Sequence, residues 1–154
     1  MALDTKSFDL HRKLPLAPAR LWQVLTDAKE REKWNGPDAT TMLETDVADL
    51  SIGGLDRHRF GPKDAPEFVV ETRWYDLTKA ERAVFTETLI FGGVAVSTSL
   101  VTYVLDGSSN QTELGITVAV SSFSGPDTLD EIQQGWAGGV DNLAAYTMAL
   151  AHPA

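Results

Sequence analysis

Residues 114–151 read LGITVAVSSFSGPDTLDEIQQGWAGGVDNLAAYTMALA, and they are the most informative part of the sequence because they join a predicted strand to a predicted long helix. Up to Val120, branched apolar residues alternate with small or polar ones, which predicts a strand with one buried face. Gly125-Pro126 then ends the strand. Beyond this break, apolar residues recur at helical spacing and predict a helix that ends near Ala151. Its apolar stripe consists of Trp136, Val140, Leu143, Thr147 and Leu150.

The predicted helix has two further features. Asp127 is expected to be its N-cap, because an aspartate side chain accepts hydrogen bonds from the first free backbone N–H groups of a helix. Gly135, Gly138 and Gly139 interrupt the helix, and each costs about 1 kcal/mol relative to alanine. Two explanations stay open. Either the helix approaches the sheet closely at these glycines, or they leave space for a ligand beneath the helix.

The preceding chain supplies the sheet that this helix covers. Residues 6–14 alternate and predict a first strand, and two short helices are expected over residues 18–27 and 29–34. Residues 38–120 predict about six strands separated by turns. The turns are expected at Gly53-Gly54, Gly61-Pro62, Thr78-Lys79, Gly92-Gly93 and residues 107–110. This order predicts an α+β fold in which a long helix lies across a curved antiparallel sheet, with an apolar cavity where the sheet bends away.

Residues 88–105, TLIFGGVAVSTSLVTYVL, carry no charge and approach the length of a membrane span. However, Gly92-Gly93 lies inside this stretch, and β-branched residues follow it. A Gly-Gly pair between β-branched runs is typical of two strands joined by a tight turn. We therefore expect a hairpin here and no membrane span.

Composition sets limits on partners and chemistry. The 154 residues carry a formal net charge of -9, which disfavours nucleic acid and anionic membrane surfaces as partners. Cysteine is absent, so disulfides and thiolate chemistry are excluded. The length predicts one domain over residues 1–154. The N-terminal residues have no apolar run behind a basic start, so no secretory leader is expected and a cytoplasmic location is the default. A homodimer through exposed sheet edges stays open, because nothing in the sequence specifies it.

Six short segments form an ordered set along the chain. They are LAPARLWQVLTD at 16–27, WNGP at 34–37, DLSIGG at 49–54, ERAVFT at 81–86, STSLVT at 97–102 and GWAGGVDNL at 135–143. Together they resemble the SRPBCC (START-like, helix-grip) superfamily and, more narrowly, its branch named for the activator of the Hsp-ninety ATPase. The resemblance covers nearly the whole chain and implies a helix-grip fold with a ligand cavity between the C-terminal helix and the sheet. It implies no catalytic set, because the superfamily uses one cavity for binding, for catalysis and for cochaperone work.

Two positions depart from the pattern of this branch. Asn35 stands where the branch usually has a second aromatic residue, and Ser51 stands where it often has arginine or lysine. The first change is expected to widen or polarise the cavity near the second helix. The second removes a surface charge.

No catalytic or metal-binding motif is visible in the sequence. It contains no nucleophile elbow, no phosphate-binding loop and no pair of histidines at helical spacing, so no cofactor or metal is expected. His58 and Glu87 are weak catalytic candidates. His58 is either a partly buried imidazole on a solvated strand or a polar group of the cavity. Glu87 is either solvated or a cavity carboxylate with a raised pKa that acts as a general base.

Aromatic residues and residues of the long helix are the stronger candidates for ligand contacts. Aromatic side chains dominate the walls of small-molecule sites. The predicted set is Trp34, Thr72, Trp74, Phe85, Trp136, Gly139, Val140 and Leu143. The main hypothesis is a protein that binds a small apolar or amphipathic ligand. The alternatives are a cyclase, dehydratase or hydrolase that uses a cavity carboxylate or histidine, and a cochaperone that stimulates a heat-shock ATPase, which the family name alone implies.

Overall fold

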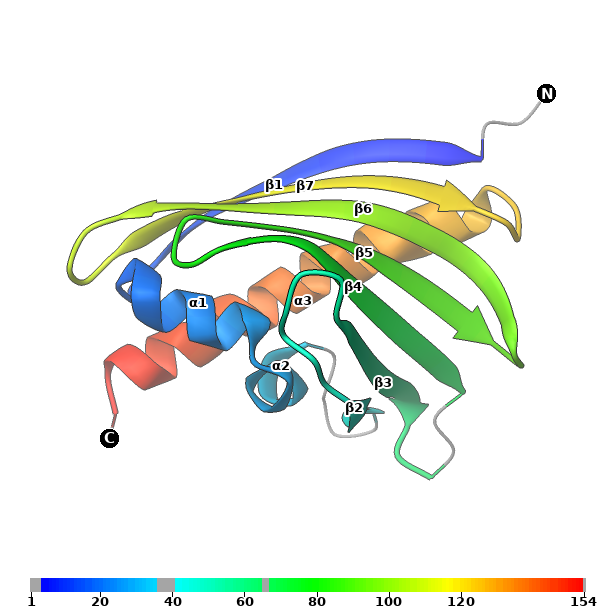
Figure 1. Cartoon of the computed structure of the whole chain (residues 1–154), viewed down its shortest axis with the longest axis horizontal. Helices are drawn as coiled ribbons and strands as arrows, with labels where there is room; N and C mark the ends of the chain where they lie inside the picture. Colours follow the sequence, from blue (N-terminus) through cyan, green and yellow to red (C-terminus); the bar gives the residue numbers. More distant parts are fainter. Residues whose placement is uncertain (1–3, 36–40, 65–66, 154) are drawn as a thin grey trace.

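The computed structural model describes residues 4–35, 41–64 and 67–153, and within them a curved antiparallel sheet carries helices on one face (Figure 1). The strands are β1 (Thr5–Leu14), β2 (Thr41–Val47), β3 (Leu55–Pro62), β4 (Phe68–Thr78), β5 (Arg82–Phe91), β6 (Val94–Gly107) and β7 (Thr112–Ser122). The helices are α1 (Pro18–Thr26), α2 (Ala28–Trp34) and α3 (Asp127–Ala151). The α+β fold predicted from the sequence is confirmed.

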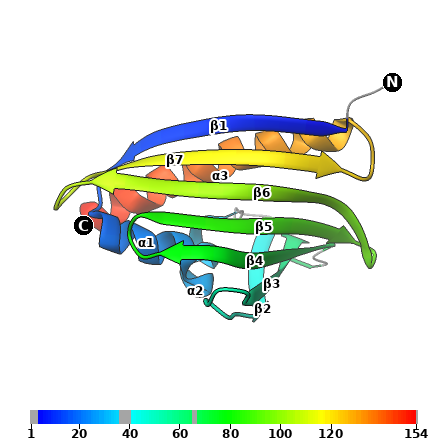
Figure 2. The same cartoon turned by 45° about the horizontal axis from the view of Figure 1, so that its top comes forward.

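The strand order across the sheet is β1-β7-β6-β5-β4-β3-β2, and every neighbouring pair is antiparallel (Figure 2). Strands β2 to β7 are therefore sequential neighbours, which suits short turns. Strand β1 is the exception to this order, because it pairs with the last strand, with Phe8 opposite Val118. The first strand thus lies beside the strand that leads into α3.

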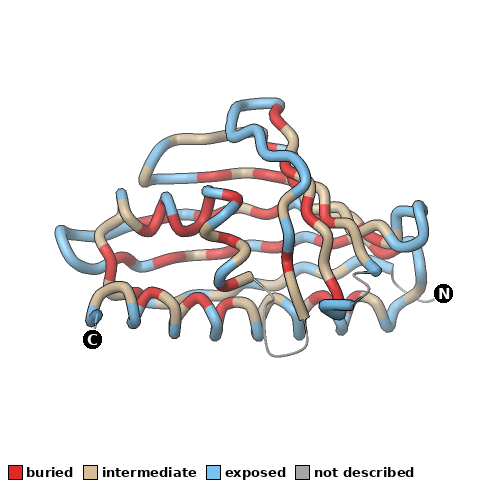
Figure 3. The backbone as a smooth tube through the Cα atoms, turned by 90° about the horizontal axis from the view of Figure 1, so that it is seen from below, coloured by how far each residue is buried: buried red, intermediate tan, exposed pale blue. Residues whose placement is uncertain are grey.

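Side-chain alternation divides the sheet into an inner and an outer face. On β7, Leu114, Ile116, Val118 and Val120 are all buried, while the residues between them are more exposed. Figure 3 shows this alternation along the strands and the recurrence of buried residues along one side of α3. The inner face and that side of the helix form the core, as the two periodicities predict.

The uncharged stretch of residues 88–105 forms the end of β5, a turn at Gly92-Gly93 and most of β6, so the predicted hairpin is confirmed. Both glycines have positive φ angles, 59° and 81°, which glycine adopts without strain. Among the helices that the structure describes, none is long and apolar enough to cross a membrane.

The two short helices are fixed by local contacts. Pro18 begins α1, where its missing N–H group costs nothing. Asp27 then separates α1 from α2 and caps α2, because its carboxylate accepts a hydrogen bond of 2.9 Å from the backbone N–H of Glu30. At the other end of α2, the indole N–H of Trp34 donates to the carbonyl oxygen of Val24 at 2.9 Å. These contacts hold α2 against α1.

The long helix α3 is held at both ends but by different partners. Near its start, Lys6 of β1 forms an ion pair of 3.1 Å with Asp130. Near its end, the hydroxyl group of Tyr146 donates to the carboxylate of Glu30 at 2.5 Å, which ties the helix to α2. The second half of α3 therefore packs in a closed layer with the short helices, and the first half extends beyond them.

Three local predictions are wrong by one or a few residues. Asp127 is the first residue of α3; Pro126 takes the N-cap position and no side chain caps it. Gly61-Pro62 belongs to β3, because Pro62 ends the strand and still pairs with Thr41. The turn expected at Thr78-Lys79 falls one residue later, since Thr78 still pairs with Arg82 and Ala80 takes the positive φ of 64°.

Candidate functional site

A cavity of about 430 Å³ lies between the first half of α3, the end of α2 and the inner face of the sheet, mainly β3 to β5. It opens beside the part of α3 that the short helices do not cover. Volumes of this size are typical of small-molecule sites. Among the described residues, no group of three His, Asp or Glu side chains is arranged to hold a metal ion.

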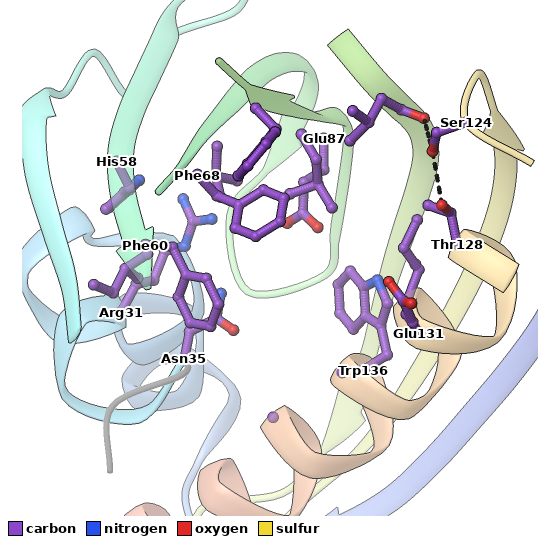
Figure 4. Close-up of a pocket in the computed structure, with 18 of the residues that line it drawn as sticks. Arg31, Asn35, His58, Phe60, Phe68, Glu87, Ser124, Thr128, Glu131 and Trp136 are labelled. Atoms are coloured by element: carbon purple, nitrogen blue, oxygen red, sulfur yellow. Dashed lines mark hydrogen bonds between the residues drawn. The ribbon is translucent and has the colours of Figure 1, made fainter. Parts of the chain in front are cut away.

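The walls of the cavity are largely apolar and aromatic. The sheet contributes Phe60 from β3, Phe68 and Val70 from β4, and Leu89 and Phe91 from β5. Phe68 and Phe91 are opposite each other in the register, and their ring centroids lie 5.2 Å apart. The helices contribute Trp34, Ile132 and Trp136. In Figure 4, Phe60 and Trp136 lie on opposite sides of the cavity, and Phe68 lies near Glu87.

Glycines shape the helical wall. Gly135 and Gly139 line the cavity, whereas Gly138 is exposed and lies outside it. A Cβ atom added at Gly135 or Gly138 would meet nothing within 4 Å, and one at Gly139 would lie 3.5 Å from Oδ1 of Asn35. None of these distances requires a glycine for close approach to the sheet. Of the two explanations for the glycines, space beneath the helix fits Gly135 and Gly139, and Asn35 lines the same space.

The closed end of the cavity contains a buried ion pair. The side chain of Arg31 is 4% exposed and that of Asp56 is 1% exposed, and their charged atoms lie 3.4 Å apart. Arg31 also donates to the hydroxyl oxygen of Thr72 at 3.2 Å, and its guanidinium lies 5.8 Å from the centre of the Trp74 ring. Burial raises the pKa of Asp56, while the N–H group of Asp49 and the charge of Arg31 act in the opposite direction. The positive charge of Arg31 is therefore already partnered.

His58 lines the cavity and is completely buried. Neither ring nitrogen has a well-formed hydrogen bond to a described residue. Burial, and then the nearby charge of Arg31, lowers the pKa of His58 to about 4. A buried imidazole beside a fixed cation cannot take up a proton at neutral pH without a large loss of solvation energy. His58 is consequently neutral at pH 7.

Glu87 supplies the free carboxyl group of the cavity. It lies in one row of the inner face, opposite Thr72 on β4 and Ser99 on β6. Figure 4 shows its carboxyl group directed into the cavity beside Phe68. It forms no hydrogen bond or ion pair with any residue that the structure describes. Burial raises the pKa of Glu87, and the charge of Arg31 offsets part of this effect.

Polar residues mark the opening. Ser124, Thr128 and Glu131 lie where β7 leads into α3, and the hydroxyl groups of Ser124 and Thr128 lie 2.7 Å apart (Figure 4). The hydroxyl of Ser124 also donates to the carbonyl oxygen of Val96 at 3.3 Å. Glu131 is exposed and forms no ion pair with a described residue. The opening therefore carries a second carboxylate.

The structure separates the predicted ligand contacts into two groups. Trp34, Trp136 and Gly139 line the cavity, as do the two weak catalytic candidates His58 and Glu87. The other five residues are enclosed in the core and do not line it. These are Thr72, Trp74, Phe85, Val140 and Leu143. They lie on the predicted inner faces, but other side chains pack against them: Arg31 contacts Thr72 and Trp74, and Phe85 packs between Trp74 and Tyr103.

A chain of aromatic rings connects these two regions. The centroids of Trp74 and Phe85 lie 5.1 Å apart, those of Phe85 and Tyr103 also 5.1 Å, and those of Tyr103 and Trp136 6.4 Å. The last two pairs meet edge to face, an arrangement that aromatic rings favour. The core residues thus support the cavity wall from behind.

Several lining residues were not predicted from the sequence. Phe68 lies on the same face of β4 as Trp74, and Leu89 and Phe91 lie on the same face of β5 as Phe85. Period-two alternation extended to the ends of these strands would have selected them. No pattern in the sequence predicts that Arg31 lines the cavity, because a charged residue on a short helix normally faces solvent.

The fold and the cavity define a helix-grip protein, and sequence comparison supplies the family. The chain belongs to the family described as "Activator of Hsp90 ATPase homolog 1-like protein", whose model matches residues 15–148. This confirms the resemblance to that branch of the SRPBCC superfamily. No curated protein matches the chain.

Solved structures share the fold along nearly the whole chain. The Mll3558 protein of Rhizobium loti is 26% identical, with a TM-score of 0.78 and coverage of 94% of this chain and 99% of that one. The CV1439 protein of Chromobacterium violaceum is 22% identical, with a TM-score of 0.78 and coverage of 92% and 96%. The AHSA1 protein SPO3351 of Silicibacter pomeroyi is 17% identical, with a TM-score of 0.73 and coverage of 96% and 100%.

Proposed function

We propose that this protein binds a small amphipathic molecule in the cavity between α3 and the sheet. The observation that carries this proposal is the cavity itself, about 430 Å³ in volume and lined by aromatic and aliphatic side chains from three parts of the fold. Small-molecule sites combine such a wall with a small number of polar groups that fix orientation. Here the carboxyl of Glu87 is one such polar group, and the family fold commonly serves ligand binding.

The arrangement of the walls indicates how the ligand lies. Its apolar body packs between Phe60, Phe68 and Trp136, where burial of each CH₂ group contributes about 0.8 kcal/mol. Its polar end reaches toward Glu87 at the inner face of the sheet. A ligand without any apolar body would leave the aromatic walls hydrated and gain little from this site.

The test is a fluorescence titration of the full chain with N-phenyl-1-naphthylamine, a neutral aromatic dye that emits strongly in apolar sites. We expect saturable binding by the wild type and at least tenfold weaker binding by Gly135→Phe, because the new ring occupies the opening. The matched control is Gly138→Phe on the same helix, outside the cavity, which should bind like the wild type. Absence of dye binding by the wild type, or equal binding by both variants, would refute the proposal.

A proton-transfer enzyme is the second candidate, and one observation favours it. His58 and Glu87 line the same cavity, which is the condition that this alternative requires. A panel of ester, epoxide and hydroxy-carbonyl compounds that bind the chain tests it by product formation. Turnover that is lost in Glu87→Gln, with binding retained, would support this function. Stimulation of a heat-shock ATPase stays a prediction, and its assay is ATP hydrolysis by the chaperone with and without the chain.

A further inference from the structure

We infer that the cavity selects organic amines, meaning ligands with a protonated nitrogen on an aromatic or aliphatic body. This inference rests on the proposed function and names the class of ligand for the same cavity. Three observations carry it: the aromatic rings that line the cavity into which Glu87 points, the balance of charge in the cavity, and the absence of a partner for Glu87 among the described residues.

The aromatic rings provide the first reason. Phe60, Phe68 and Trp136 come from β3, β4 and α3, and all three line the space into which Glu87 points (Figure 4). The face of an aromatic ring attracts a cation, and the attraction is strongest for tryptophan and where water is excluded. An organic cation can therefore contact several rings while its nitrogen approaches the carboxyl group. An anion would meet the same ring faces with repulsion.

The charge balance provides the second reason. The charged groups that line the cavity are Arg31, Glu87 and Glu131. The guanidinium of Arg31 is paired with Asp56 and bonded to Thr72, so its attraction for an anion is reduced, although its charge still acts on Glu87. The two carboxyl groups have no such partners among the described residues. The charged groups of the cavity that lack a described partner are therefore both carboxyl groups, one at its inner face and one at its opening.

The state of Glu87 provides the third reason. Its carboxyl group lies between the buried residues Thr72 and Ser99 in the register, yet it forms no hydrogen bond with a described residue. Glu87 itself is half-buried, so its carboxyl oxygens remain within reach of a ligand in this largely apolar cavity. An ammonium group would supply both the missing hydrogen bonds and the missing counter-charge, and charge-assisted hydrogen bonds are the stronger kind. A neutral alcohol supplies only a hydrogen bond.

The test compares three ligands that share one apolar body: 4-phenylbutylamine, 4-phenylbutan-1-ol and 5-phenylpentanoate, which are cationic, neutral and anionic at pH 7.5. Each is titrated against the full chain carrying N-phenyl-1-naphthylamine, and displacement is measured by loss of fluorescence. We expect the amine to displace the dye at a concentration at least tenfold below that of the alcohol, and the carboxylate to be the weakest. This comparison needs no variant.

The variant Glu87→Gln keeps the shape of the side chain and removes its charge. We expect the amine and the alcohol to differ by less than twofold in their displacement of the dye bound to this variant. The matched control is Glu113→Gln, an exposed residue on the outer face of β7, which should keep the full preference. Thermal unfolding of each variant verifies that it is folded.

The possible failures can be told apart. If the dye binds the wild type but the amine and the alcohol displace it equally, or the carboxylate displaces it best, the selection of amines is wrong and ligand binding stands. A preference for the amine that persists in Glu87→Gln would also overturn the inference. If neither the dye nor any of the three compounds binds, the proposed function fails and this inference fails with it.

Discussion

Replacement of His58 by leucine is expected to remove part of the acid sensitivity of the fold. The imidazole is fully buried, and its pKa falls from 6.5 to about 4 in the folded chain. Between these values the unfolded chain binds more protons than the folded chain. The free energy of unfolding contributed by a neutral His58 is therefore complete above pH 6.5 and is lost as the pH falls toward 4.

The size of the effect follows from the two pKa values. Each pKa unit corresponds to about 1.4 kcal/mol, so His58 alone accounts for a loss of about 3 kcal/mol between pH 7 and pH 4. At pH 7 we expect His58→Leu to lie within about 1 kcal/mol of the wild type, because the substitution removes two unpartnered nitrogens and keeps an apolar volume. The variant should therefore be the more stable chain at pH 4.

The assay is urea denaturation of both chains at intervals from pH 4 to pH 8, with the difference in free energy of unfolding plotted against pH. Other groups that face His58, namely Arg31, Glu32 and Asp46, are present in both chains, so the difference isolates the histidine. His11→Leu, a change at an exposed position of β1, controls for the loss of a histidine as such. A difference that stays constant from pH 4 to pH 8 would refute the reasoning.

Three further predictions concern stability. Glu87→Gln should raise the free energy of unfolding at pH 8, with the gain shrinking toward pH 4, because burial raises the pKa of Glu87 and disfavours its ionised form; urea denaturation at both values measures this. Arg31→Met should cost about 3–5 kcal/mol at pH 7 by leaving Asp56 buried and unpaired, and Arg31→Met with Asp56→Leu should recover most of it. Gly138→Ala should raise the thermal midpoint through a gain of up to about 1 kcal/mol, since the position is exposed and its Cβ meets nothing. A thermal midpoint equal to that of the wild type would contradict the expected cost of glycine relative to alanine in this helix.

The fold could be predicted from the sequence because strand alternation and the spacing of apolar residues in a helix are local patterns. Alternation at residues 114–120 and the helical stripe through Val140 and Leu143 select the faces that meet, and both are buried. The N-cap of α3 was not accessible, since Asp127 lies one residue inside the helix and the cap at Pro126 makes no side-chain hydrogen bond. A side-chain pattern predicts which face of a helix or strand is buried more reliably than it predicts the residue at which the element begins or ends.

The candidate site was accessible only in part, for a physical reason. Phe85 and Glu87 share a face of β5; the sequence predicts Phe85 as a ligand contact and leaves Glu87 either solvated or inside the cavity. Whether an inward side chain meets α3 or empty space depends on where the helix diverges from the sheet, which is a tertiary property. Phe85 is therefore packed in the core while Glu87 lines the cavity. The ion pair of Arg31 with Asp56 joins α2 to β3 and depends on the same arrangement.

A crystal structure of the chain grown with 4-phenylbutylamine would show directly whether an amine occupies the cavity. We expect density for the phenyl ring among Phe60, Phe68 and Trp136, with the nitrogen at a hydrogen-bond distance of about 2.8 Å from a carboxylate oxygen of Glu87. An amine bound elsewhere on the protein, or a cavity filled by the chain's own side chains, would contradict this expectation.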